Sequence, residues 1–106
     1  NRLIYREKVN PESMTDVKAG IIYSDANAEE AKLVKEQLIN LGINVVCTGT
    51  VSKTHTQFVA HSKNITNDYY NWLKKKMPSI IGYQFVFEPN NYYCDGTDFT
   101  VVIAGK

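Results

Sequence analysis

The sequence predicts an α/β fold of the α+β sandwich class, with a ferredoxin-like arrangement in which two helices cover one face of a mixed sheet. The main observation is a unit that occurs twice: an apolar run, an amphipathic helical stretch and a second apolar run. Each unit has the form of a β-α-β crossover, which is right-handed in nearly all proteins and makes its two strands parallel. Two crossovers joined by a short loop give the split β-α-β order, β-α-β-β-α-β, and this chain adds an extra C-terminal strand.

The chain has the size and composition of one globular domain. Its 106 residues are enough for a single apolar core, and 43% of them are hydrophobic. Residues 1–17 mix charged and turn-forming residues, and we expect them to be a linker or an N-terminal arm before a domain at residues 18–106. Because the sequence begins with Asn1 rather than Met, we also expect it to be a piece of a longer protein.

Charge and hydropathy argue against two classes of partner. The formal net charge is +1, whereas a nucleic-acid-binding domain needs an excess of Lys and Arg to displace counterions from the phosphates. No apolar run approaches the ~20 residues that cross a bilayer. We therefore expect no nucleic acid as a partner and no membrane insertion of this segment.

The first unit consists of a strand, a helix and a second strand with recognisable end signals. A strand is predicted at residues 18–23, which are continuously apolar after Lys18, as in a central strand. Asn27 is placed to cap a helix over residues 28–41, and Gly42 is placed to end it before a strand at residues 43–47. The apolar residues that recur at three- and four-residue steps along the helix, and that we expect to face the sheet, are Ala31, Val34, Leu38 and Leu41.

The second unit begins with an alternating strand at residues 54–61, a pattern that suits a sheet with one open face. Thr66 is a helix N-cap residue, and the helix that follows is predicted over residues 67–77. Residues 83–87 are the fourth predicted strand, and residues 99–104 are the last, apolar on both faces.

The sequence resembles the LytR C-terminal domain family. The resemblance lies in the first strand (residues 20–23), the helix from Ala31 to Gly42, the Asn-Val-Val segment at residues 44–46, a Thr-rich third strand, and the closing Asp-Phe-Thr-Val-Val-Ile at residues 98–103. Together these parts extend over the predicted domain.

This resemblance implies a non-catalytic accessory domain, of the kind that follows a catalytic LytR–CpsA–Psr domain in bacterial cell-envelope proteins. Catalysis would then belong to another domain of the parent protein. The implied location is extracytoplasmic, at the cell surface of a Gram-positive bacterium, with the membrane anchor outside this chain. The implied ligand is peptidoglycan or another cell-wall glycan, or an anionic polymer of the teichoic-acid type.

Aromatic and lysine side chains are the candidate binding residues. Aromatic rings stack on sugars, and Lys attracts anionic polymers. Lysines in the last helical turn also complement the helix dipole, and aromatic residues at helical spacing are often core. The candidates on the second helix are Tyr69, Trp72, Lys74 and Lys75, and those in a late loop are Tyr92 and Tyr93; the open sheet face is a further expected binding surface.

The two cysteines and two histidines do not form a recognisable reactive site. Cys47 and Cys94 form either a disulfide or two free thiols packed as small hydrophobic side chains, and the second interpretation is favoured. Neither the cysteines nor His55 and His61 have the close spacing that structural zinc sites usually show, and we interpret both histidines as solvated strand residues. No catalytic residue, metal or cofactor is predicted.

Two other functions stay open. One is a protein–protein interaction or self-association module that positions a neighbouring catalytic domain, and such a module should expose an apolar patch. A small-molecule or nucleic-acid-binding ferredoxin-like domain is disfavoured by the low net charge.

Overall fold

The computed structural model describes residues 16–50, 55–89 and 96–104. Their secondary structure follows the predicted order of strands and helices closely. The elements are β1 (Lys18–Tyr23), η3 (Asp25–Asn27), α1 (Ala28–Asn40), β2 (Asn44–Thr50), β3 (Gln57–Ala60), α2 (Asn67–Lys76), η4 (Pro78–Ile80), β4 (Gln84–Phe87) and β5 (Phe99–Ile103).

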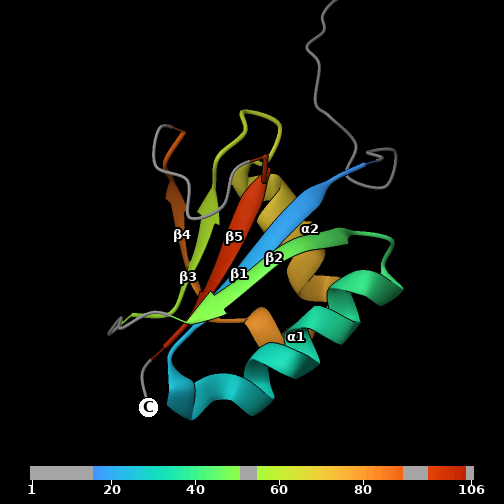
Figure 1. The fold of residues 1–106 in the computed structure, drawn as a ribbon. Helices are drawn as coiled ribbons and strands as arrows, with labels where there is room; N and C mark the ends of the chain where they lie inside the picture. The colour runs from blue at the N-terminus through green and yellow to red at the C-terminus, as the bar shows by residue number, and fades with distance from the viewer. Residues whose placement is uncertain (1–15, 51–54, 90–95, 105–106) are drawn as a thin grey trace, which may run out of the picture.

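The predicted fold class is confirmed. The described strands form one mixed sheet of five in the order β2-β1-β5-β3-β4, and both helices lie on the same side of it, as in a ferredoxin-like α/β sandwich (Figure 1). β1 is parallel to β2 and to β5, and β3 is parallel to β4 and antiparallel to β5. The strands of each crossover are direct neighbours, so β5, the extra strand, separates the two units rather than dividing either of them.

α1 begins where the sequence predicts, but its cap differs from the expectation. The Asn27 side chain is buried and makes no capping hydrogen bond to the helix backbone. Instead its Oδ1 accepts a hydrogen bond from the Ser24 hydroxyl at 2.6 Å, and its Nδ2 donates to Glu30 Oε1 at 3.4 Å. The helix ends before Gly42, whose φ of 86° is in the left-handed region that favours glycine.

α2 has the predicted cap. The Thr66 hydroxyl oxygen accepts a hydrogen bond from the Tyr69 backbone N–H at 3.2 Å, which satisfies one of the free amides of the first turn. The helix carries Lys74, Lys75 and Lys76 in its last turn, and Pro78 follows it.

The main core lies between the sheet and the helices. Phe58 of β3 is at its centre, with its ring centroid 4.7 Å from that of Phe99 and 5.0 Å from that of Tyr70. The Tyr70 hydroxyl lies 2.8 Å from the carbonyl oxygen of Ile80 and 2.7 Å from that of Tyr83, so it joins α2 to the segment that enters β4.

The acidic residue of the closing motif has a structural role. The Asp98 carboxylate accepts a hydrogen bond from the Lys18 backbone N–H at 2.9 Å. The Asp98 backbone N–H donates a hydrogen bond to the Lys18 carbonyl oxygen at 2.7 Å. Its carbonyl accepts from the His61 N–H at 2.8 Å. Asp98 therefore fixes the start of β5 against both β1 and the end of β3.

The prediction of an open sheet face is wrong for the centre of the sheet. The strand registers place Ile22, Val59, Thr100 and Val102 on the face opposite the helices, and all four are buried, three of them completely. Three of the four form a second apolar cluster of their own. The physical reason is visible in β5, which is apolar on both faces and therefore needs cover on both.

Candidate functional site

A cleft lies between α1 and the carboxyl-terminal ends of β1 and β2. Its volume is about 190 Å³. Its lining combines apolar, hydroxyl-bearing and positively charged side chains: Ile21, Tyr23, Ala28, Ala31, Lys32, Lys35 and Thr48. Ligands of α/β sheets commonly bind just outside the carboxyl ends of the strands, where this cleft is found.

The first crossover builds this cleft by local sequence rules. In the strand register, Ile21 pairs with Thr48, so both residues are at the same level of the sheet. On α1, the lining residues recur at three- and four-residue steps, which puts them on one side of the helix. Two of these are alanines, Ala28 and Ala31, whose short side chains leave room between the helix and the sheet.

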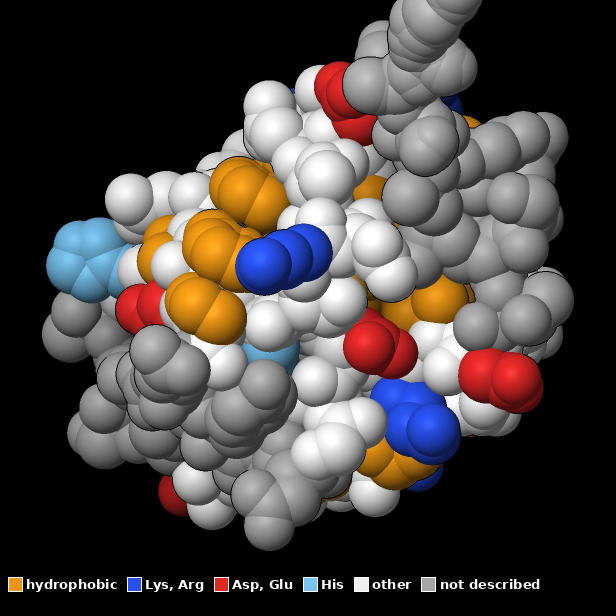
Figure 2. Space-filling model, turned by 90° about the horizontal axis from the view of Figure 1, so that it is seen from above, with side chains coloured by type: hydrophobic (Ala, Val, Ile, Leu, Met, Phe, Trp, Pro, Cys, Tyr) orange, Lys and Arg blue, Asp and Glu red, His pale blue; other side chains and the backbone are white. Residues whose placement is uncertain are grey.

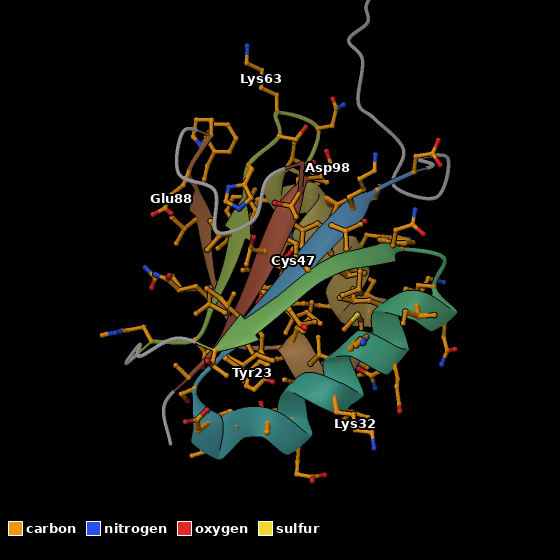
Figure 3. The ribbon with its side chains drawn as sticks, viewed as in Figure 1. Tyr23, Lys32, Cys47, Lys63, Glu88 and Asp98 are labelled. Carbon is orange, nitrogen blue, oxygen red and sulfur yellow. The ribbon has the colours of Figure 1, made fainter. Side chains whose placement is uncertain are left out.

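The cleft favours an anionic ligand. Ile21 and Ala31 are buried and give it an apolar floor, whereas Lys32 and Lys35 are exposed at its rim. Figure 3 shows Tyr23 at the end of β1 and Lys32 projecting from α1. Lysine ammonium groups donate charge-assisted hydrogen bonds to phosphate or carboxylate oxygens, and the described lining residues include no carboxylate to compete.

Elsewhere on the described surface, the last turn of α2 carries three lysines, Lys74, Lys75 and Lys76. On the face in Figure 2, Lys or Arg side chains alternate with Asp and Glu side chains around a group of hydrophobic residues. Long-range attraction of a polyanion by the whole molecule is therefore weak at a net charge of +1. Any anion selectivity has to come from a local pair such as Lys32 and Lys35.

The aromatic candidates on α2 are mainly structural. Tyr69 is only 2% exposed, with its ring centroid 5.6 Å from Trp72 and 6.0 Å from Phe99. Burial, with a smaller contribution from the Asp98 charge, raises the pKa of Tyr69 to about 12. The expectation that Tyr69 offers a ring to a ligand is therefore wrong, because the helical spacing of the aromatic residues directs it into the core.

Trp72 is partly buried and packs against the core. Its Nε1 is buried and has no hydrogen-bond partner among the residues that the structure describes, so the polar edge of the indole does not face solvent. Only part of the ring is available to a ligand.

The two lysine candidates, Lys74 and Lys75, differ in their exposure. Lys74 is partly buried, and its Nζ lies 4.7 Å from the centroid of the Tyr70 ring, a cation–π contact within the protein. Lys75 is exposed in the same turn. Tyr92 and Tyr93 lie outside the described residues.

His61 is buried rather than solvated, which corrects its interpretation. Its Nδ1 lies 2.9 Å from the Glu88 carbonyl oxygen, which can only accept, so Nδ1 is the donor. Its Nε2 lies 2.9 Å from the Thr100 hydroxyl. His55, in contrast, is exposed as expected.

Cys47 is disulfide-bonded, so the interpretation that favoured free thiols is wrong. Cys94, the only other cysteine in the sequence, lies outside the described residues. The sequence did not decide this because both cysteines occur near predicted strand ends, where either state is possible. Disulfides persist mainly in secreted, extracellular and periplasmic proteins.

Within the parts of the chain that the structure describes, no group of three or more His, Cys, Asp or Glu side chains is placed to hold a metal ion. In the same residues, no helix has both the length and the apolar character needed to cross a membrane. A scan against family models found no match to this chain, and neither the curated proteins nor the solved structures that were searched contain one.

The cleft has no clear signal in the sequence, because its lysines are at positions that face water. Lys32 and Lys35 do face water, but they also border a hollow that only appears when the helix is placed on the sheet. The available signal was the pair of alanines, Ala28 and Ala31, on the same side of the helix as the two lysines.

Proposed function

We propose that this chain is a non-catalytic binding domain of a bacterial cell-envelope protein that works outside the cytoplasm. Its ligand is an anionic wall polymer of the teichoic-acid type, held in the cleft beside α1. The observation that carries the proposal is the pairing of Lys32 and Lys35 with the Tyr23 and Thr48 side chains around one small cleft, with no carboxylate among its described lining residues.

Two further observations support the location and the family context. The disulfide at Cys47 is typical of proteins in an oxidising compartment, as the outer side of a bacterial membrane is. The resemblance to the LytR C-terminal domain family in residues 18–106 agrees with an accessory domain of an envelope protein.

The chemistry of the cleft fits one phosphate and part of the unit attached to it. The Lys32 and Lys35 ammonium groups neutralise the phosphate, and the Tyr23 and Thr48 hydroxyls donate hydrogen bonds to its oxygens or to ligand hydroxyls. The apolar floor at Ile21 accepts the carbon skeleton. Since both lysines are exposed, binding of a single repeat is weak and is screened by salt, with a Debye length of about 8 Å at physiological ionic strength.

Retention on purified bacterial cell wall tests this proposal. We expect the chain to bind wall that carries its phosphate polymer and to bind wall stripped of that polymer much less. The variant Lys32→Glu/Lys35→Glu should lose most of the retention. The variant Lys75→Glu/Lys76→Glu is the matched control, because it changes the net charge equally on exposed residues of α2.

Three results would count against the proposal. Equal loss in the two double variants would mean that only net charge matters. Equal retention on intact and stripped wall would point to peptidoglycan as the ligand. No retention of folded wild-type protein at low salt would remove wall binding altogether.

A further inference from the structure

A second hollow lies next to the cleft, at the other end of α1 and β2. Its volume is about 440 Å³, and its walls come from the end of α1, the turn after this helix and the first half of β2. Two of its lining side chains are exposed aliphatic ones, Ile39 at 52% and Val46 at 50%. The hollow therefore offers apolar surface beside a site that we propose to bind a long polymer.

The cleft and the second hollow use the same side of α1. Lys32 and Lys35 line the cleft, and Ile39 lines the second hollow. These three residues follow one another at steps of three and four along the helix, so they form one row on its surface. Because α1 packs alongside β2, this row follows the margin of the sheet (Figure 1).

The register shift in β2 puts the two hollows on the same face of the sheet. Ala19 pairs with Val45, and Ile21 pairs with Thr48. Ala19 and Ile21 both belong to the core under the helices, so Val45 and Thr48 both face the helices as well. Two residues three apart in a regular strand would face opposite sides. The shift thus aligns the β2 wall of the second hollow with that of the cleft.

The charge of the second hollow also suits an anionic chain. Lys18 is exposed and lines it, and its described lining residues include no carboxylate. Asp98 accepts a hydrogen bond from the Lys18 backbone N–H but does not line the hollow. The Lys18 ammonium group can therefore pair with a phosphate, and the amide of Asn44, another lining residue, can bond to ligand hydroxyls.

We propose that the cleft and the second hollow form one groove that binds consecutive repeats of the same anionic polymer. This inference rests on the proposed function, because the cleft holds the first phosphate. The carbon skeleton of a following repeat packs on Ile39 and Val46, and its phosphate pairs with Lys18. Val45 and Thr48 are about 10 Å apart along β2, so a few repeats reach from one hollow to the other. Because the second contact is made within one bound chain, it raises the affinity above that of the cleft alone.

The dependence of affinity on ligand length tests this inference. The probes are glycerol 3-phosphate and glycerol phosphate oligomers of increasing length, titrated into the isotope-labelled chain and followed by NMR. Affinity is compared per repeat, since a longer oligomer offers more equivalent segments. It should rise about tenfold or more over the first few repeats and then level off. The amides of Ile39 and Val46 should shift with the oligomers but not with the single unit.

Two pairs of variants separate the groove from general charge and hydrophobicity. Lys18→Gln should lose most of the gain with length and bind glycerol 3-phosphate like the wild type. Its matched control is Lys63→Gln, because Lys63 is an exposed lysine that projects from the loop after β3 (Figure 3). Ile39→Ser should also reduce the gain, whereas Leu33→Ser should not, since Leu33 is 47% exposed on α1 but lines neither hollow.

The possible failures are distinguishable. A per-repeat affinity that does not depend on length, with shifts confined to the cleft, would overturn the groove and leave the proposed cleft intact. Equal loss in Lys18→Gln and Lys63→Gln would also overturn the groove, because net charge alone would then explain the gain. If neither the single unit nor the oligomers bind at low salt, the proposed function and the groove are both wrong.

Discussion

At the scale of single residues, buried tyrosines keep their hydroxyl groups neutral because the core is dry. Tyr69 and Tyr83 are both buried, and burial is the main reason that the pKa of each is raised. For Tyr83, the nearby Glu30 carboxylate adds to the effect, and the Tyr83 hydroxyl lies 3.5 Å from Glu30 Oε2. Both side chains therefore make the fold sensitive to alkali, including Tyr69, which was a candidate ligand-binding ring in the sequence.

Replacing Tyr69 by Phe should make the protein less sensitive to alkali. In the wild type the unfolded chain ionises Tyr69 near its ordinary pKa of 10.0, whereas the folded chain holds that pKa at about 12. The stabilisation is therefore complete below pH 10 and is lost as the pH rises from 10 to 12, by up to about 2 kcal/mol. Denaturant unfolding at a series of pH values should show a smaller alkaline fall for Tyr69→Phe, and an identical fall would contradict the burial of this hydroxyl.

His61 shows how far a residue can be understood from the sequence. Its place in the alternating pattern was predicted correctly: it directly follows β3, and its ring reaches Thr100 on the face opposite Phe58. The alternating pattern did not show that this face of the sheet is buried. On it, the His61 ring lies within hydrogen-bond distance of the Thr100 hydroxyl and the Glu88 carbonyl oxygen. These partners are 39 and 27 residues away in the chain, so no local signal identifies them.

At the scale of elements, the two helices differ in how they begin. α2 uses the Thr66 hydroxyl as a backbone cap, whereas the buried Asn27 side chain before α1 bonds to Ser24 and Glu30. Cap residues and periodicity predicted both helices to within one residue at each end. The difference between the caps comes from burial, which the sequence near each helix does not fix.

Removing the Thr66 hydroxyl should destabilise α2. Thr66→Ala leaves the Tyr69 N–H without its acceptor and should lower the free energy of unfolding by about 1 kcal/mol. Thr66→Ser keeps the acceptor and should stay close to the wild type. Urea unfolding of the three proteins measures this, and an equal loss in both variants would show that the methyl group, not the hydroxyl, is important.

The turn after α1 offers a second test with a built-in control. A Cβ added at Gly42 or at Gly49 meets no atom within 4 Å, but only Gly42 is among the residues with positive φ, at +86°. Gly42→Ala should therefore cost about 1 kcal/mol of stability from backbone strain alone, whereas Gly49→Ala should cost little or nothing. If thermal unfolding midpoints fall equally in the two variants, strain at the helix end is not the cause.

At the scale of the whole molecule, the fold was more predictable than the site. Each crossover is local in sequence, so its strands and helix could be recognised from end signals and periodicity. The position of β5 between the two units depends on pairing between residues 99–103 and strands far away in the chain, and the sequence did not determine it. The cleft is likewise a product of packing, because it depends on the gap that Ala28 and Ala31 leave between α1 and the sheet.

The net charge of the whole molecule also affects how it can bind a polyanion. With 12 Lys and Arg against 11 Asp and Glu, the chain has no strong overall field. A polyanion is therefore bound through a local site or hardly at all, and this makes the role of Lys32 and Lys35 testable against the exposed pair Lys75 and Lys76 at the end of α2.

The most direct test of the central claim is an NMR titration of the isotope-labelled chain with soluble poly(glycerol phosphate). We predict that the amide shifts change in a saturable way around the cleft, at Ile21, Tyr23, Lys32, Lys35 and Thr48, and that added salt reverses them. Shifts concentrated around Lys75 on α2, or no saturable shifts at low salt, would contradict the assignment of this cleft as an anion-binding site.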